Sequence, residues 1–209
     1  MKPTNGRGQP RPSPKKQPQK IPEVLSLDEQ ARLLAQLDDD SPSSVRNRAI
    51  LRVFLNTGIR CSELINLKVH DIDWLTGDFM VRQGKGGKDR SLTLNDDDLA
   101  LLKSYLNTSS TRASSGNRPV FTTLDGKAPL CGRWLRHWVK RLGEKAGIAK
   151  NLHPHLFRHT LACDLLRATN SLKVVQDTLG HENIATTTIY ARLVNGEVKQ
   201  ALKNLRNGG

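Results

Sequence analysis

The sequence predicts a mainly α-helical protein with a small antiparallel β-sheet, an α+β fold class. Three observations lead to this class. Apolar residues recur at helical spacing through most of the chain, the stretch 69–94 alternates apolar and polar positions between glycine turns, and 36% of the 209 residues are hydrophobic. A chain of this length and composition can bury the core of one ordinary domain, which excludes a fully disordered protein.

Three helices are expected before residue 68. Ser26 and Glu29 have the spacing of a capping box at the start of the first helix, which runs to about Asp38. The acidic and serine-rich segment 38–44 interrupts the pattern. A second, strongly apolar helix then covers residues 49–55 and stops at Gly58, a residue suited to a helix C-cap. A short third helix holds residues 60–67.

The stretch 69–94 predicts a sheet of two or three strands. Residues 79–82 and 91–94 are the clearest strands, with glycine-rich turns before and between them. Asn95 then caps a helix whose first turn carries three aspartates, where carboxylates suit the helix dipole. Beyond a polar loop at 107–118, we expect helices at about 130–147, 155–168, 171–179, 185–191 and 195–206.

The chain carries 33 Lys and Arg against 20 Asp and Glu, a net charge of +13. Such a surplus favours a polyanionic partner, either nucleic acid or an anionic membrane surface. Six of the basic residues and five of the ten prolines lie in residues 1–20, which hold no acidic residue. We therefore expect a disordered basic tail at 1–20, either a solvated leader or an arm that contacts phosphates, ahead of a folded domain at 21–209.

Several classes of protein are excluded by what the sequence lacks. No run of 18 apolar residues predicts a transmembrane helix, and the N-terminus has no apolar region typical of a signal peptide. Cys61, Cys131 and Cys163 are scattered and odd in number, which argues against disulfides and against a zinc site. These features indicate a reducing, cytoplasmic compartment.

Two motifs in the N-terminal half carry chemically active side chains, and each is weak alone. Arg60 and Glu63, in the sequence TGIRCSEL, are three residues apart, and taken alone this spacing is more often an ion pair on a helix face than a functional site. Residues 84–90, GKGGKDR, do not match a Walker A loop. They form either a solvated hairpin or a turn that presents a lysine to a nucleic-acid backbone.

Two further motifs follow in the C-terminal half. In the sequence HPHLFRH, His155 and Arg158 share one helix face, while His155 and His159 have the spacing of a metal pair without an evident third ligand. The sequence LGHENIATTTIY places His181 after a helix end and Tyr190 nine residues later. A lone histidine or tyrosine is ordinarily a structural residue.

Taken in order and spacing, the four motifs resemble the catalytic domain of the tyrosine recombinases, the phage integrase family, over residues 23–193. Lys85, rather than Lys88, matches the lysine of that family's β-hairpin. The resemblance implies a catalytic set with no member replaced and with Glu63 in a supporting role: Arg60, Lys85, His155, Arg158, His181 and Tyr190.

The resemblance implies cleavage of DNA by attack of Tyr190 on a phosphodiester, which leaves a 3′-phosphotyrosyl link and a 5′-hydroxyl and needs no ATP. The two arginines and His181 would stabilise charge on the phosphate, His155 would accept the tyrosine proton, and Lys85 would protonate the leaving oxygen. No cofactor, metal, membrane or small-molecule substrate is expected. The expected partners are double-stranded DNA and other recombinase protomers, as a dimer or tetramer.

Two alternatives and two open points accompany this interpretation. A type IB topoisomerase uses related chemistry, and a non-catalytic or regulatory DNA-binding protein could keep the fold. Family members commonly carry a helical core-binding domain before the catalytic domain, so this chain is either a fragment or a naturally short recombinase similar to the fimbrial-switch invertases. The apolar stripe of helix 195–206 packs either on its own core or on a neighbouring protomer.

Overall fold

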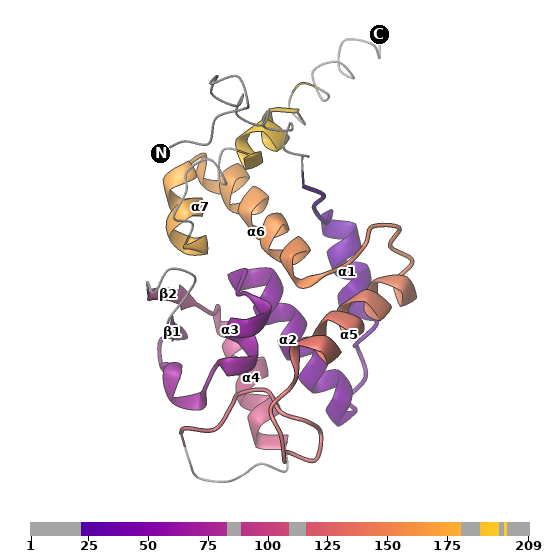
Figure 1. Cartoon of the computed structure of the whole chain (residues 1–209), viewed down its shortest axis with the longest axis vertical. Coiled ribbons are helices and arrows are strands. Elements are labelled where there is room, and N and C mark those ends of the chain that lie inside the picture. Colours follow the sequence, from indigo (N-terminus) through magenta and orange to yellow (C-terminus); the bar gives the residue numbers. More distant parts are fainter. Residues whose placement is uncertain (1–21, 83–88, 109–115, 181–188, 197–198, 200–209) are drawn as a thin grey trace, which may run out of the picture.

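The computed structural model describes residues 22–82, 89–108, 116–180, 189–196 and 199, and it confirms the mainly helical class with a two-stranded antiparallel sheet (Figure 1). The predicted basic tail lies outside the described residues, as do Lys85 and His181. Within the described part, no helix is long and apolar enough to cross a membrane. In chain order the elements are α1 (Leu27–Ala35), α2 (Pro42–Thr57), α3 (Cys61–Asn66), η1 (Val69–Asp71), β1 (Asp78–Val81), β2 (Arg90–Thr93), α4 (Asp96–Thr108), α5 (Gly132–Lys145), α6 (Pro154–Thr169) and α7 (Leu172–Leu179).

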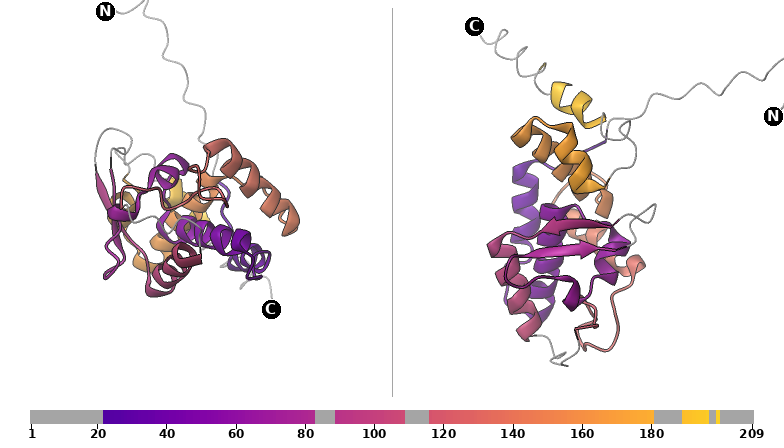
Figure 2. Two further views of the ribbon diagram at one scale, coloured as in Figure 1. Left: turned by 90° about the horizontal axis from the view of Figure 1, so that it is seen from below. Right: turned by 90° about the vertical axis from the view of Figure 1, so that its left-hand side faces the viewer.

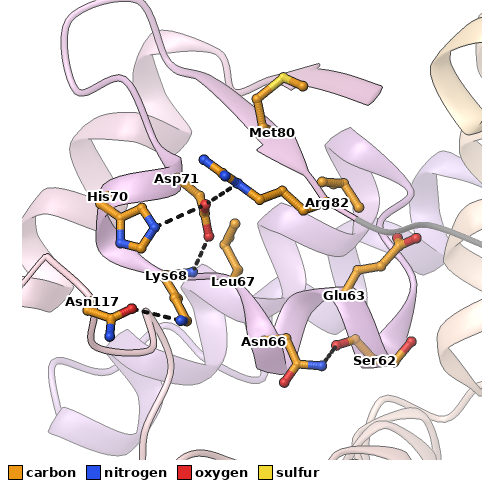
Figure 3. Close-up of a pocket in the computed structure, with 11 residues that line it drawn as sticks. Ser62, Glu63, Asn66, Leu67, Lys68, His70, Asp71, Met80, Arg82 and Asn117 are labelled. Carbon is orange, nitrogen blue, oxygen red and sulfur yellow. Dashed lines mark hydrogen bonds and ion pairs between the residues drawn. The ribbon is translucent and has the colours of Figure 1, made fainter. Parts of the chain in front are cut away.

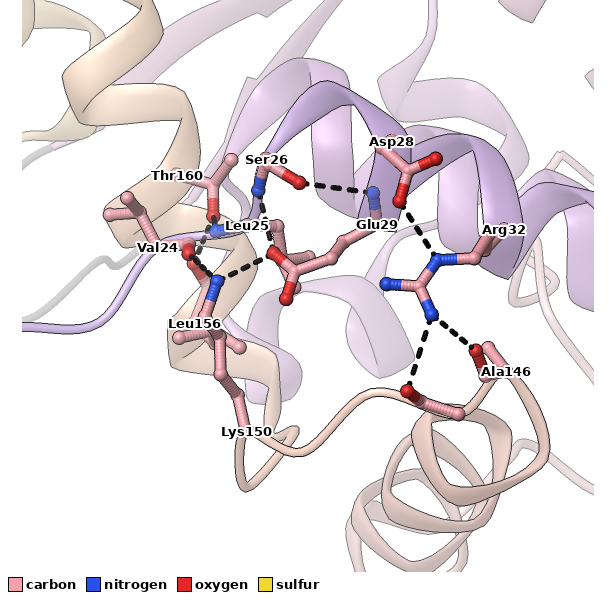
Figure 4. Close-up of polar contacts among 11 residues, drawn as sticks. Val24, Leu25, Ser26, Asp28, Glu29, Arg32, Ala146, Lys150, Leu156 and Thr160 are labelled. Carbon is pink, nitrogen blue, oxygen red and sulfur yellow. Dashed lines mark hydrogen bonds and ion pairs between the residues drawn. The ribbon is translucent and has the colours of Figure 1, made fainter.

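Helix α1 begins with the predicted capping box and is tied by it to the C-terminal half of the chain (Figure 4). The Ser26 hydroxyl accepts from the Glu29 amide, and the Glu29 carboxylate accepts from the Ser26 amide at 2.7 Å. The same carboxylate accepts from Lys150 Nζ at 2.5 Å, and Arg32 donates to the carbonyl oxygen of Ala146 at 3.1 Å. One carboxylate therefore both caps α1 and fixes it beside the turn that follows α5.

The core is centred on α2 and α6, which cross with Phe54 stacked on Phe157 at a ring-centroid distance of 5.7 Å. Both rings are fully buried. Helix α2 begins earlier than the apolar pattern predicts, because Ser41 caps it and Pro42 occupies its first position. It ends as predicted at Gly58, which adopts the left-handed conformation with φ 59°.

The sheet confirms the two clearest predicted strands. Strands β1 and β2 pair in antiparallel register, with Phe79 opposite Leu92 and Val81 opposite Arg90. Figure 2 shows the two strands lying side by side across the helices. The side chains of Phe79, Val81 and Leu92 are buried, whereas the intervening positions are exposed, as alternation requires. The start of the predicted sheet region is instead the 3₁₀ helix η1.

The C-terminal part of the described chain forms α6, α7 and a further helical stretch. Pro154 opens α6, and α7 ends at Gly180, which is left-handed with φ 61°. Residues 189–196 form one continuous helical stretch, which corrects the predicted gap between the segments 185–191 and 195–206. Leu193 and Val194, which fall in that gap, pack against a second buried cluster on α6 and α7. This packing supports helix where the sequence pattern gave no clear period.

Gly58 should be more sensitive to substitution than a glycine with the same backbone but more space. A Cβ at Gly58 would lie 2.9 Å from Leu179 Cδ2, whereas at Gly147, with φ 66°, the nearest atom is 3.7 Å away. Gly147→Ala should lower the unfolding free energy by about 1–2 kcal/mol through backbone strain alone. Gly58→Ala should lose about 1–3 kcal/mol more through overpacking. Urea unfolding of both variants measures this, and equal losses would contradict it.

Candidate active site

The left-handed turn at Gly58 carries the chain from α2 into α3 and presents Arg60 at the first position before that helix. Glu63, the third residue of α3, accepts from the Arg60 backbone amide at 2.7 Å. Its other oxygen accepts from Arg60 Nη1, also at 2.7 Å. The carboxylate therefore both completes the cap of α3 and holds the guanidinium, which is the pairing that the sequence spacing predicted.

A second arginine, Arg90, hydrogen-bonds to the same carboxylate, and the sequence analysis did not single it out. Arg90, the first residue of β2, donates from Nη1 and Nη2 to the two oxygens of Glu63 at 2.9 and 2.7 Å. The side chains of Arg90 and Glu63 are both 8% exposed. Burial alone would raise the pKa of the Glu63 carboxyl, but the hydrogen bonds from Arg90 and Arg60 lower it to about 2. Glu63 is thus ionised at any physiological pH.

Arg158, on α6, is a buried cation held by carbonyl oxygens. It is 4% exposed and donates from Nη1 to the Gly58 carbonyl at 2.8 Å and from Nη2 to the Leu179 carbonyl. Both acceptors lie at helix C-termini, where the helix dipole is negative. No carboxylate among the described residues forms an ion pair with it. Burial, followed by the positive charges of Arg60 and Arg90, lowers the pKa of Arg158 to about 10.

His155 lies exposed on the first turn of α6. Desolvation, followed by the charges of His153, Arg158 and Arg60, lowers the pKa of its imidazole below the usual value. His155 therefore lies within electrostatic range of Arg158 and Arg60. A neutral imidazole of this kind can accept a proton at neutral pH.

Tyr190 lies in the helical stretch 189–196, and its side chain is buried. It is 1% exposed, packed among Cys163, Val175 and other residues of α6 and α7, and its hydroxyl oxygen lies 2.9 Å from Nδ1 of His159. Burial raises the pKa of Tyr190 to about 12, although the charge of Arg158 opposes this. Burial, followed by the charge of His155, lowers the pKa of His159 to about 4. The tyrosine is protonated and paired with a neutral imidazole.

The structure thus brings together Arg60, Glu63, Arg158 and His155, and it places Tyr190 beside His159, the residue that follows Arg158 on α6. Lys85 and His181 lie outside the described residues. Two residues that the sequence analysis left without a role occupy central positions: Arg90 and His159. A signal for each was present, since Arg90 closes the GKGGKDR motif and His159 follows His155 by one helical turn.

A pocket of about 490 Å³ opens beside this cluster between α3, η1 and β1 (Figure 3). Glu63 lies at one end, and Asp71 lies at the other, where it accepts from Arg82 Nε at 3.1 Å. Lys68 donates to Asn117 at 2.7 Å on the same wall. Across the described ranges, no three His, Cys, Asp or Glu side chains are grouped as metal ligands would be.

The sequence model of the phage integrase family matches residues 23–197. This chain belongs to that family. The match covers most of the chain, including the three segments that carry the arginine cluster and the segment that carries Tyr190. It confirms the resemblance drawn from the four motifs.

Within the phage integrase family, the curated relatives are tyrosine recombinases. The chain is 38% identical over 178 residues to tyrosine recombinase XerC of Xanthomonas axonopodis pv. citri, covering 85% of this chain and 56% of the relative. It is 33% identical over 186 residues to a tyrosine recombinase of Thermosipho africanus, covering 89% and 62%. The chain therefore spans somewhat less than two thirds of the length of these relatives.

Solved structures agree on the fold. The XerA recombinase matches with a TM-score of 0.75 and 33% identity, over 90% of this chain and 67% of that one. The XerH recombinase, solved on its palindromic difH substrate after cleavage, matches with a TM-score of 0.74 and 27% identity, over 90% and 54%. The Tn1549 transposon integrase, at 20% identity and a TM-score of 0.69 over 87% and 62%, shows the shared fold only.

The His159 imidazole predicts a specific dependence of stability on pH. Its pKa is about 4 in the folded chain against an ordinary 6.5. Above pH 6.5 the imidazole is neutral in both states and its contribution to stability is complete. As pH falls from 6.5 to 4, the unfolded chain binds a proton that the folded chain does not, so stability decreases. Unfolding free energies of wild type and His159→Gln between pH 7 and pH 4 measure this; equal slopes would contradict it.

Proposed function

We propose that this chain is the catalytic domain of a site-specific DNA recombinase that cleaves and rejoins strands through a 3′-phosphotyrosyl intermediate. Membership of the phage integrase family and similarity to tyrosine recombinases support this. The proposed catalytic set is Arg60, Lys85, His155, Arg158, His181 and Tyr190, with Glu63 positioning Arg60.

The observation that carries the proposal is the uncompensated positive charge of the arginine cluster. Among the described residues, Glu63 is the carboxylate that pairs with Arg60 and Arg90, and no carboxylate pairs with Arg158. Arg158 is almost fully buried, and a buried charge without a counter-ion is strongly unfavourable. A phosphodiester would supply the missing negative charge. Guanidinium groups also match phosphate oxygens with two parallel hydrogen bonds, which a lysine cannot do.

In the proposed reaction, the Tyr190 oxygen attacks phosphorus, the Tyr–O–P bond forms, and the bond from phosphorus to the 5′-oxygen breaks. His155 accepts the tyrosine proton, and Lys85 donates a proton to the leaving oxygen. Arg60, Arg158 and His181 stabilise the added charge on the non-bridging oxygens. The reverse sequence, with a 5′-hydroxyl as the attacking group, rejoins strands without an external energy source.

The contact between Tyr190 and His159 is, in this proposal, the resting arrangement before cleavage. A buried tyrosine whose pKa is about 12 is a poor nucleophile at neutral pH. It must leave His159 and approach the cluster of Arg60 and Arg158, whose charge lowers the pKa of a nearby phenol. DNA binding would supply the scissile phosphate toward which it moves.

The proposed substrate is double-stranded DNA, and the proposed partners are further recombinase protomers on that DNA. The XerH relative was solved on a palindromic DNA substrate, which fits pairing of protomers on two half-sites. Cys61, Cys131 and Cys163 form no disulfide in the structure, which fits a reducing cytoplasm. The basic segment 1–20 adds six positive charges that can strengthen binding to phosphates.

Tyr190→Phe should abolish the covalent adduct with a nicked suicide DNA substrate while leaving DNA affinity within about threefold, since the phosphate ligands remain. Denaturing gel electrophoresis detects the adduct. Tyr105→Phe is the matched control, because Tyr105 is the other of the two tyrosines in the chain. It lies on α4, where its ring is buried and stacked on Phe121. An adduct formed by Tyr190→Phe would contradict the assignment. Normal DNA binding without an adduct in wild type would support a non-catalytic DNA-binding protein instead.

Lys85→Ala should slow cleavage of ordinary DNA by about 10²–10⁴-fold, the usual contribution of a general acid. A 5′-phosphorothiolate at the cleavage site should restore the rate, because a thiolate leaves without protonation. Lys88→Ala is the matched control, from the same glycine-rich turn, and should lose little on either substrate. If Lys88→Ala shows the loss and the rescue instead, the general acid is Lys88.

A further inference from the structure

We propose that Arg90 is a positioning residue that holds Glu63 in the orientation in which Arg60 keeps most of its guanidinium free for the scissile phosphate. The proposal rests on the proposed function and extends it to a residue outside the catalytic set. It starts from the geometry of a single carboxylate shared by two arginines.

The acceptor capacity of Glu63 is fully used. An ionised carboxylate offers about four lone-pair sites. Arg60 fills two of them, through its backbone amide and Nη1, and Arg90 fills the other two, through Nη1 and Nη2. Only one of the N–H groups on the Arg60 guanidinium is therefore spent on Glu63, and no other described residue hydrogen-bonds to that guanidinium. The rest remain for a ligand.

Without Arg90, Glu63 would lose the two hydrogen bonds that leave Arg60 only one side-chain bond to it. An arginine beside a carboxylate commonly forms two parallel hydrogen bonds with it. Two acceptor sites of Glu63 would become vacant next to Arg60, and the Arg60 guanidinium could rotate to fill them. Arg60 would then be drawn toward Glu63 and away from the phosphate, even though its own side chain is unchanged.

Arg90 itself is placed to act through Glu63 and not on DNA. Its side chain is 8% exposed, whereas that of Arg60 is 20% exposed. It reaches Glu63 past Gly180, where a Cβ would lie 2.8 Å from Arg90 Cδ, so the glycine leaves room for the side chain. Its Nε is buried and has no hydrogen-bond partner among the described residues. The two bonds to Glu63 are therefore what orient this guanidinium.

The location of Arg90 also connects three of the motifs. It begins β2, directly after the glycine-rich turn that carries Lys85, and it contacts both α3, which carries Glu63, and the end of α7 that precedes His181. A single side chain thus links segments that are far apart in sequence. Its two hydrogen bonds require a planar fork, which a lysine does not have.

Arg90→Lys tests the proposal, because it keeps the positive charge and removes the fork. Single-turnover cleavage of suicide DNA should fall about 10²-fold, the cost of a misplacement of about 1 Å at a reacting centre. The dissociation constant for DNA should stay within about threefold, as expected when only a transition-state interaction is lost. Arg90→Ala should show at least the same loss, and melting curves identify any variant that is not folded.

A methylphosphonate at the cleavage site separates positioning from a general structural role. This group carries no charge on its non-bridging oxygen, so the transition state depends less on Arg60. The loss caused by Arg90→Lys should therefore shrink to about threefold or less on this substrate, as should the loss caused by Arg60→Lys. A variant that merely weakens the fold would lose the same factor on both substrates.

Arg52→Lys is the matched control. Arg52 on α2 also donates to a buried carboxylate, Asp98 on α4, at 2.5 Å, and this pair shares no residue with the arginine cluster. It should change stability without changing the rate on either substrate.

Three results would overturn the proposal. The first is wild-type cleavage by Arg90→Lys, and the second is a loss that is equal on the phosphodiester and the methylphosphonate. The third is the same loss and rescue with Arg52→Lys. If the wild-type chain forms no adduct with either DNA, the proposed function fails, and the role of Arg90 fails with it. If wild type cleaves and any of the three results is obtained, only the role of Arg90 fails.

Discussion

The Arg158 guanidinium is buried between the C-terminal ends of two helices, and its hydrogen bonds to the carbonyls of Gly58 and Leu179 hold α2, α6 and α7 together at one point. Those carbonyls carry the negative ends of the helix dipoles, which partly offset a charge that has no carboxylate partner in the described part of the chain. Gly58 and Gly180 adopt the left-handed conformation that ends α2 and α7, and Arg158 donates to carbonyl oxygens at these two helix ends.

The remaining polar groups of the site are arranged around that charge. Glu63 neutralises one of its neighbours, Arg60, while Arg90 takes up the acceptor capacity that would otherwise immobilise Arg60. The cluster keeps a net positive charge beside the exposed face of α6, where His155 lies. The hydrogen bonds to Glu63 and to the two carbonyl oxygens stabilise this arrangement without a ligand, and in the proposed reaction it would stabilise added negative charge on the phosphate.

Helix α6 carries both Arg158 of this cluster and His159, which lies beside the buried Tyr190. Arg158 and His159 are consecutive residues, so their side chains leave the helix about 100° apart. Arg158 contacts the ends of α2 and α7, while His159 contacts the tyrosine within the second apolar cluster. The same helix therefore carries the buried arginine and the histidine that lies beside Tyr190.

The sequence predicted the local features well because they depend on short-range rules. The capping box at Ser26, the helix end at Gly58 and the strands around Phe79 and Leu92 were all found as expected. The predicted pairing of Arg60 with Glu63 was also correct, because side chains three positions apart at the start of a helix are neighbours. The start of α2 and the continuous helix at 189–196 differed from the sequence prediction. Helix α2 begins inside a polar segment because Ser41 caps it, and residues 189–196 are helical although their apolar period is weak, because Leu193 and Val194 pack against the second buried cluster.

By itself, the sequence determined the fold class, the family and the order of the residues proposed for catalysis, because motifs and periodicities are properties of neighbouring positions. Only the tertiary structure decided which groups share a carboxylate and where the tyrosine rests. Arg90 lies 27 residues after Glu63, and Tyr190 lies 31 residues after His159. Contacts at such separations depend on how helices and strands pack, and a hydrogen bond forms only where that packing brings donor and acceptor within about 3 Å.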